Sequence, residues 1–213
     1  MSECRIVAIL SCLIFVGCYS TRSVVPAKAS IDLPERSFTL AVITASDFDS
    51  SGIDFVVERA SNILARDLNI SLVLQAIYKS DAVSELESKS YSTWSNLVQD
   101  WSARVGAETD KSLNSHQIVY VMIPGDLDLV DRLFGATAGM AKVGSIQRRG
   151  LAAGIISRNR ELSARLMAHE VTHVLGVSHE VGDCKALYSL EKNNRLSAAT
   201  RMQVNQFLFS HNL

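Results

Sequence analysis

Residues 169–179 have the sequence HEVTHVLGVSH, and the spacing of its histidines predicts the local structure in this part of the chain. His169 and His173 are four residues apart, so a helix places both imidazoles on one face, one turn apart. Two imidazoles in this arrangement can reach one metal ion at about 2.0–2.1 Å. Glu170 is turned by about 100° from that row, so it can instead accept a proton from a water on the metal. We therefore expect a metal site on a helix.

The end of this stretch predicts how the helix stops. Gly176 enters the left-handed conformation freely, so we expect it to end the helix and to turn His179 back as a third ligand. Three imidazoles and one open position are typical of a catalytic zinc site. The alternative is that these are ordinary surface histidines. With 5 His and 11 Gly in the chain, chance produces this spacing on the order of once in 10⁵ sequences.

The eleven-residue string resembles the signature of the metzincin clan of zinc endopeptidases. The alternation of strands and helices before it is similar to that clan's N-terminal subdomain, and the segment from Phe134 to His173 loosely resembles archaemetzincins. The resemblance implies a zinc-dependent endopeptidase acting on a peptide or protein substrate, with one catalytic Zn²⁺. It also implies the site residues: His169, His173 and His179 as ligands and Glu170 as general base.

Two features depart from that pattern. The segment 184–188, CKALY, occupies the place of the clan's Met-containing turn, with Ala186 or Leu187 where Met is expected. Glu180 resembles an acidic residue of astacins, although a solvated carboxylate is the simpler interpretation. Tyr188 resembles a tyrosine that in astacins and serralysins can approach the zinc and stabilise the transition state; a packing tyrosine is the default. The missing Met leaves open a zinc-binding envelope lipoprotein that has lost proteolytic activity.

The N-terminus predicts export. Residues 6–17 are almost wholly apolar, yet as a helix they would span about 18 Å, well short of a hydrocarbon core of about 30 Å. The sequence Phe15-Val16-Gly17-Cys18 resembles the lipobox of bacterial lipoproteins. We expect a signal peptide at 1–17, a lipidated Cys18 with a tether to residue 36, and a lipid-anchored protein of the bacterial cell envelope. An ordinary signal peptide cleaved nearby is the alternative.

Composition and periodicity predict the rest of the chain. The net charge of −1 does not indicate binding to nucleic acid. Cys184 is the one cysteine beyond the signal region, so we expect no internal disulfide. We expect a monomer with one domain at 37–213, divided into subdomains 37–176 and 177–213. The predicted fold is α/β and metzincin-like: a twisted, mostly parallel sheet, a backing helix, an active-site helix and a small C-terminal subdomain ending in a helix.

The individual elements follow from local patterns. We expect strands at 37–45, 70–77, 117–123 and 150–157, and a weaker one at 136–144 that could pair with an extended substrate. Helices are expected from residue 53, and at 90–105, 159–175 and 195–209. In the helix at 90–105, Trp94, Leu97 and Trp101 share one face, which is typical of core packing.

Overall fold

The computed structural model describes residues 33–81, 83, 113–125, 139–178, 196 and 198–213. All of them belong to one compact unit, 32–213. The predicted signal peptide, Cys18 and most of the tether lie outside the described residues, as do the predicted helix at 90–105 and the segment 179–195. In the part of the chain that is described, no helix is long and apolar enough to cross a membrane.

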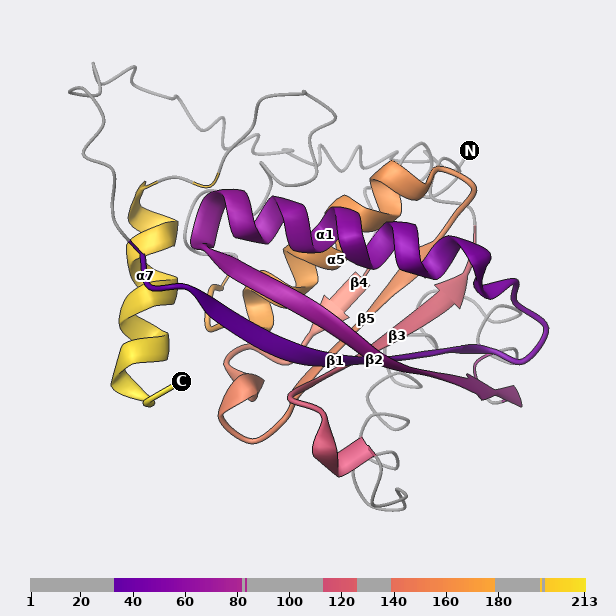
Figure 1. Cartoon of the computed structure of the whole chain (residues 1–213), viewed down its shortest axis with the longest axis horizontal. Helices are drawn as coiled ribbons and strands as arrows, with labels where there is room; N and C mark the ends of the chain where they lie inside the picture. The colour runs from indigo at the N-terminus through magenta and orange to yellow at the C-terminus, as the bar shows by residue number, and fades with distance from the viewer. Residues whose placement is uncertain (1–32, 82, 84–112, 126–138, 179–195, 197) are drawn as a thin grey trace, which may run out of the picture. The chain divides into compact units, whose positions relative to one another are not determined.

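Five strands form one sheet in the order β2-β1-β3-β5-β4 (Figure 1). Their bounds are Arg36–Ala45 for β1, Ile70–Ser80 for β2, Ile118–Pro124 for β3, Gly139–Ala141 for β4 and Gly150–Ile156 for β5. Strands β2, β1, β3 and β5 are parallel, and β4 alone runs antiparallel to its neighbour β5. The predicted mostly parallel sheet is confirmed. Of the weaker predicted strand at 136–144, residues 139–141 form β4, 142–144 form a turn instead, and 136–138 lie outside the described residues.

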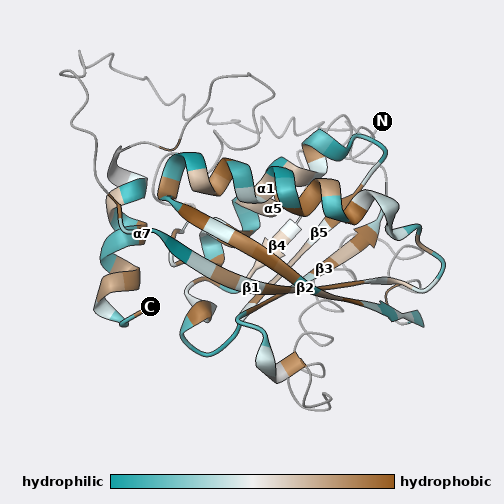
Figure 2. Ribbon diagram, viewed as in Figure 1, coloured by the Kyte–Doolittle hydropathy of each residue, from teal (hydrophilic) through white to brown (hydrophobic). Residues whose placement is uncertain are grey.

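The central strand β3 is apolar along its whole length because both faces of the sheet are buried there. β3, with the sequence IVYVMIP, is buried from Ile118 to Ile123, and Figure 2 shows the inner strands as the most hydrophobic part of the molecule. The register of β1 against β2 shifts between Leu40 and Ala41, a bulge in an otherwise regular pairing.

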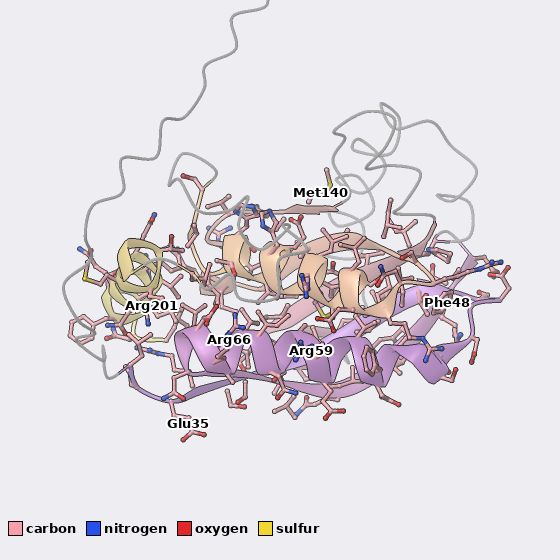
Figure 3. All side chains as sticks on the ribbon, turned by 90° about the horizontal axis from the view of Figure 1, so that it is seen from above. Glu35, Phe48, Arg59, Arg66, Met140 and Arg201 are labelled. Carbon is pink, nitrogen blue, oxygen red and sulfur yellow. The ribbon has the colours of Figure 1, made fainter. Side chains whose placement is uncertain are left out.

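Two helices lie side by side on one face of this sheet (Figure 1). α1 (Ile53–Leu68) ends at Asn69, whose φ of 57° is left-handed. α5 (Arg160–Val174) begins at Asn159, whose side chain accepts a hydrogen bond from Leu162 N. Arg59 of α1, labelled in Figure 3, binds Glu161 of α5 through two hydrogen bonds of 2.9 and 3.0 Å. Both predicted helices are confirmed to within two residues.

The remaining described elements are short or terminal. α7 (Ala198–Ser210) contacts α1 and forms the predicted C-terminal helix. Single 3₁₀ turns occur at Ser50–Gly52, Leu113–Ser115 and Ser145–Gln147. On the sheet face opposite α1 and α5, the side chains are also buried, and Val83 and Leu113 pack with them.

Candidate metal centre

The C-terminal half of α5 is buried on all sides. From Leu166 to Leu175 every residue is buried, including three side chains that can carry a charge. His169, Glu170 and His173 are each only 3% exposed. Burying polar groups without an internal partner is unfavourable, and such groups in proteins are paired or bind metals. The helix therefore places its polar residues where a ligand would have to compensate them.

The two histidines converge on one point. Their Nε2 atoms lie 3.1 Å apart, and their rings are perpendicular with centroids 4.6 Å apart. Two nitrogens at 2.0–2.1 Å from one tetrahedral zinc are separated by about 3.3–3.4 Å. The observed spacing of His169 and His173 is within a few tenths of an ångström of this value. The pair fits two adjacent corners of a zinc coordination sphere.

A backbone carbonyl sets the protonation of His173. Its Nδ1 lies 2.5 Å from Val177 O, and a carbonyl oxygen can only accept a hydrogen bond. Nδ1 of His173 therefore carries the proton and donates it, which leaves the lone pair of the neutral ring on Nε2. This is the form that binds a metal, and a hydrogen bond of this kind both orients the ring and makes Nε2 more basic.

The turn after α5 is the one predicted from Gly176. This glycine has a φ of 97°; its N–H donates to His173 O, and Val177 N donates to Thr172 O. These two bonds form a Schellman motif, with glycine at the left-handed position. The motif brings Val177 O back over the helix to His173. His179 follows directly but lies outside the described residues, as do Glu180, Cys184 and Tyr188. Across the described ranges, no third ligand joins the two histidines.

The aromatic ring of Phe207, in α7, packs against this turn. A Cβ at Gly176 would lie 2.6 Å from Phe207 Cγ, and one at Gly144 would lie 3.1 Å from Phe207 Cζ. Gly144 also has a positive φ, of 67°. Both glycines donate their N–H to His173 O, at 3.0 Å from Gly144 and 2.9 Å from Gly176. The turn after α5 and the loop after β4 thus both bind His173 O, and Phe207 of α7 packs against the glycine of each.

Glu170 lies against the edge strand β4. A Cβ at Gly139 would meet its Oε1 at 2.7 Å, so the carboxyl group touches the strand backbone. Burial raises the pKa of Glu170 to about 8. A cation held by the two histidines would act in the opposite direction and favour the carboxylate. The group can therefore exchange a proton near neutral pH.

Four of these residues were not predicted from the sequence. Gly139 and Gly144 fall inside the predicted strand 136–144, where a glycine can signal a close approach of another group. Phe207 carries no such signal, because its spacing in α7 is that of any packing residue. Val177 acts through its backbone, which no residue type reveals. The two histidines outside residues 169–179 bind glutamines elsewhere: His116 binds Gln75 Oε1 at 3.1 Å and His211 binds Gln147 Nε2 at 2.9 Å.

Comparison with known proteins agrees with this geometry. Residues 50–180 match the family model described as Metallo-peptidase family M12B Reprolysin-like. The chain is similar to the solved structure of an archaemetzincin from Methanopyrus kandleri, with 11% identity and a TM-score of 0.52 over 81% of this chain and 96% of that one. A zinc-dependent peptidase from Methanocorpusculum labreanum matches with 16% identity and a TM-score of 0.44, over 78% of this chain and 100% of that one. The metzincin resemblance and the α/β fold are confirmed.

Proposed function

Because the chain belongs to the reprolysin-like metallopeptidase family M12B, we propose that it is a zinc-dependent endopeptidase with one catalytic ion. His169, His173 and His179 are its proposed ligands, and Glu170 is its general base. The observation that carries this proposal is the convergence of two Nε2 atoms, 3.1 Å apart, on a helix that also buries Glu170. A structural zinc site has no use for a buried base.

In the proposed reaction, the metal, two residues and one strand have separate roles. Zinc, when bound, supplies a Lewis acid that makes a water molecule more acidic and polarises a peptide carbonyl. Glu170 takes the proton of the attacking water and returns it to the leaving amine. Val177 keeps His173 in the tautomer that binds metal. Among the described strands, β4 is the edge of the sheet that lies against Glu170, and we propose that its outer side pairs with an extended peptide.

The test is hydrolysis of a peptide library by purified protein, with and without a zinc chelator. Wild type should cut within peptides and lose activity on chelation. Glu170→Gln should keep about one zinc per chain and lose at least about 100-fold in kcat, the low end of general-base contributions. Zinc retained by a wild type that cuts nothing would instead favour the binding lipoprotein without proteolytic activity. A wild type that binds no zinc would reject both.

We further propose that the enzyme is a monomer anchored in the bacterial envelope through a lipid on Cys18. Support comes from the lipobox-like Phe15-Val16-Gly17-Cys18 after a short apolar run. Cys18→Ala should release the protein from membranes into the soluble envelope fraction. A protein that stays in the membrane fraction after this change would contradict the lipid anchor, and light scattering of the purified domain would test the monomer.

A further inference from the structure

The first residue of β4 has no room for a side chain. A Cβ at Gly139 would lie 2.7 Å from Glu170 Oε1, 2.9 Å from Glu170 Cδ and 2.9 Å from Ala153 O. Real Cβ atoms essentially never approach other heavy atoms this closely. Any residue other than glycine therefore forces either the carboxyl group of Glu170 or the pairing of β4 with β5 to shift.

The backbone conformation does not explain this glycine. Among the described glycines, Gly144 and Gly176 have a positive φ and Gly139 does not. It lies in extended strand, paired with Gly154 of β5. Ala141, two residues further along and hence on the same face of β4, carries a Cβ that packs against the core. What distinguishes position 139 is the carboxyl group of Glu170.

We propose that Gly139 is a positioning residue: its bare backbone forms the wall that seats the Glu170 carboxylate beside His169 and His173. This inference rests on the proposed function, in which Glu170 is the base. A glutamate side chain has three rotatable bonds, so a buried wall on one side narrows the positions its oxygens can take. Accuracy here matters because a misplacement of about 1 Å can lower a rate about 100-fold.

The first experiment compares the kinetics of Gly139→Ala with those of wild type. The three atoms nearest to the added methyl group belong to Glu170 and Ala153, so we expect it to displace the carboxylate and kcat to fall about 10–100-fold. KM should stay within about twofold, because the change acts on the transition state and not on ground-state binding. Zinc content per chain should equal that of wild type. Unchanged kcat, or a loss that only follows lost zinc, would overturn the proposal.

Gly125→Ala is the matched control. A Cβ at Gly125 would meet Ile155 Cγ2 at 2.9 Å, a clash of similar size in the same sheet, and no contact with Glu170 occurs there. Its kcat should stay within about twofold of wild type if steric strain in the sheet is not itself the cause. An equal fall of kcat in both variants would assign the effect to general strain and would count against the seat.

The second experiment needs no catalysis. Thermal unfolding of the metal-free protein is measured for wild type, Gly139→Ala, Glu170→Ala and the double variant. Removing Oε1 and Cδ leaves only the contact with Ala153 O, so the loss caused by Gly139→Ala should shrink. We expect a fall in Tm of about 4–8 °C in the wild-type background and less than half of that beside Glu170→Ala. Equal falls in both backgrounds would overturn the proposal.

The two experiments also separate this inference from the proposed function. If wild type hydrolyses no peptide, the proposed function fails, yet the unfolding cycle still decides whether Gly139 seats Glu170. If Gly139→Ala does not fold by itself, a double variant that folds supports the seat, because truncating Glu170 has then relieved the clash. If neither Gly139→Ala nor the double variant folds, the clash with Ala153 O is the cause, and the proposal that Gly139 positions Glu170 is rejected.

Discussion

Helices α1 and α5 cover the same face of the same sheet, yet they bury very different side chains. The buried residues of α1 are apolar with the one exception of Asp67, which binds Arg66 and accepts a hydrogen bond from Leu196 N. α5 buries Ser163 in its first turn, and its later turns bury two histidines, a glutamate and a threonine among apolar residues. Thr172 satisfies itself by bonding Ala168 O at 2.8 Å, whereas the other three face the candidate metal centre.

Helix α1 therefore contributes mainly to the stability of the fold, whereas α5 carries the polar groups of the candidate metal centre. The apolar face of α1 stabilises the domain because folding removes its apolar surface from water. The polar groups of α5 lower stability until a metal and a substrate compensate them, a conflict expected at functional sites. Substitutions in the two helices should therefore have effects that differ in kind and, at Glu170, in sign.

The largest effect is expected from removing a ligand from α5. His173→Ala deletes one of the two converging Nε2 atoms, so zinc affinity should fall by well over 100-fold, beyond the 10–100-fold typical of changes in groups that only support a ligand. Competition with a chelator of known affinity measures this. Ser163→Ala, in the first half of the same helix, is the control and should bind zinc normally.

Next comes a core residue of α1. Leu64 is 1% exposed, so Leu64→Ala should lower the free energy of unfolding by about 2–5 kcal/mol. Zinc affinity, measured in the same way and at a temperature where the variant is folded, should not change. A variant of Leu64 that lost zinc while fully folded would remove the distinction drawn between the two helices.

A stabilising substitution is expected in α5. In the metal-free protein the pKa of Glu170 is raised from 4.5 to about 8, so the folded state holds a proton that the unfolded state has lost between these pH values. Stability then falls as pH rises through this window. Glu170→Gln abolishes the loss and should stabilise the protein by about 2–4 kcal/mol at pH 7.5, and by almost nothing below pH 4.

Urea unfolding across this pH range measures the effect, and saturating zinc should reduce it, since the cation favours the carboxylate. Glu58→Gln, on the exposed side of α1, is the control for replacing a carboxyl group by an amide outside the candidate site. A Glu170→Gln variant less stable than wild type at every pH would contradict the interpretation of Glu170 as a buried, unfavourable group.

The smallest effect concerns the ion pair that joins the two helices. Hydrogen bonding from Arg59 holds the pKa of Glu161 below its usual value, so the pair stabilises above pH 4.5 and this contribution is lost as pH falls below it. The side chains are 46% and 36% exposed, so a double-mutant cycle with Arg59→Met and Glu161→Gln should give a coupling of about 0.5 kcal/mol at pH 7. It should weaken as pH falls below 4.5 and in 1 M salt.

The regular elements were predictable because their signals are local. The β-rich run of β1, the apolar run of β3 and the glycine after α5 each act within a few residues, and the structure follows all three. Contacts between distant segments were not predictable in this way. Gly139 and Glu170 are brought together only by the pairing of β4 with β5 and the packing of α5 on that edge. His179 and Tyr188 stay predictions, since both lie outside the described residues.

The ring of Phe207 has a consequence for the order in which the domain matures. It packs against Gly176 and Gly144, the two turns that meet at His173, but it comes later in the chain than either. A nascent polypeptide that has already emerged through residue 178 still lacks the surface on which those turns rest. The centre therefore reaches its packed form only after α7 docks, and a chain truncated before residue 207 should lack the support of both turns.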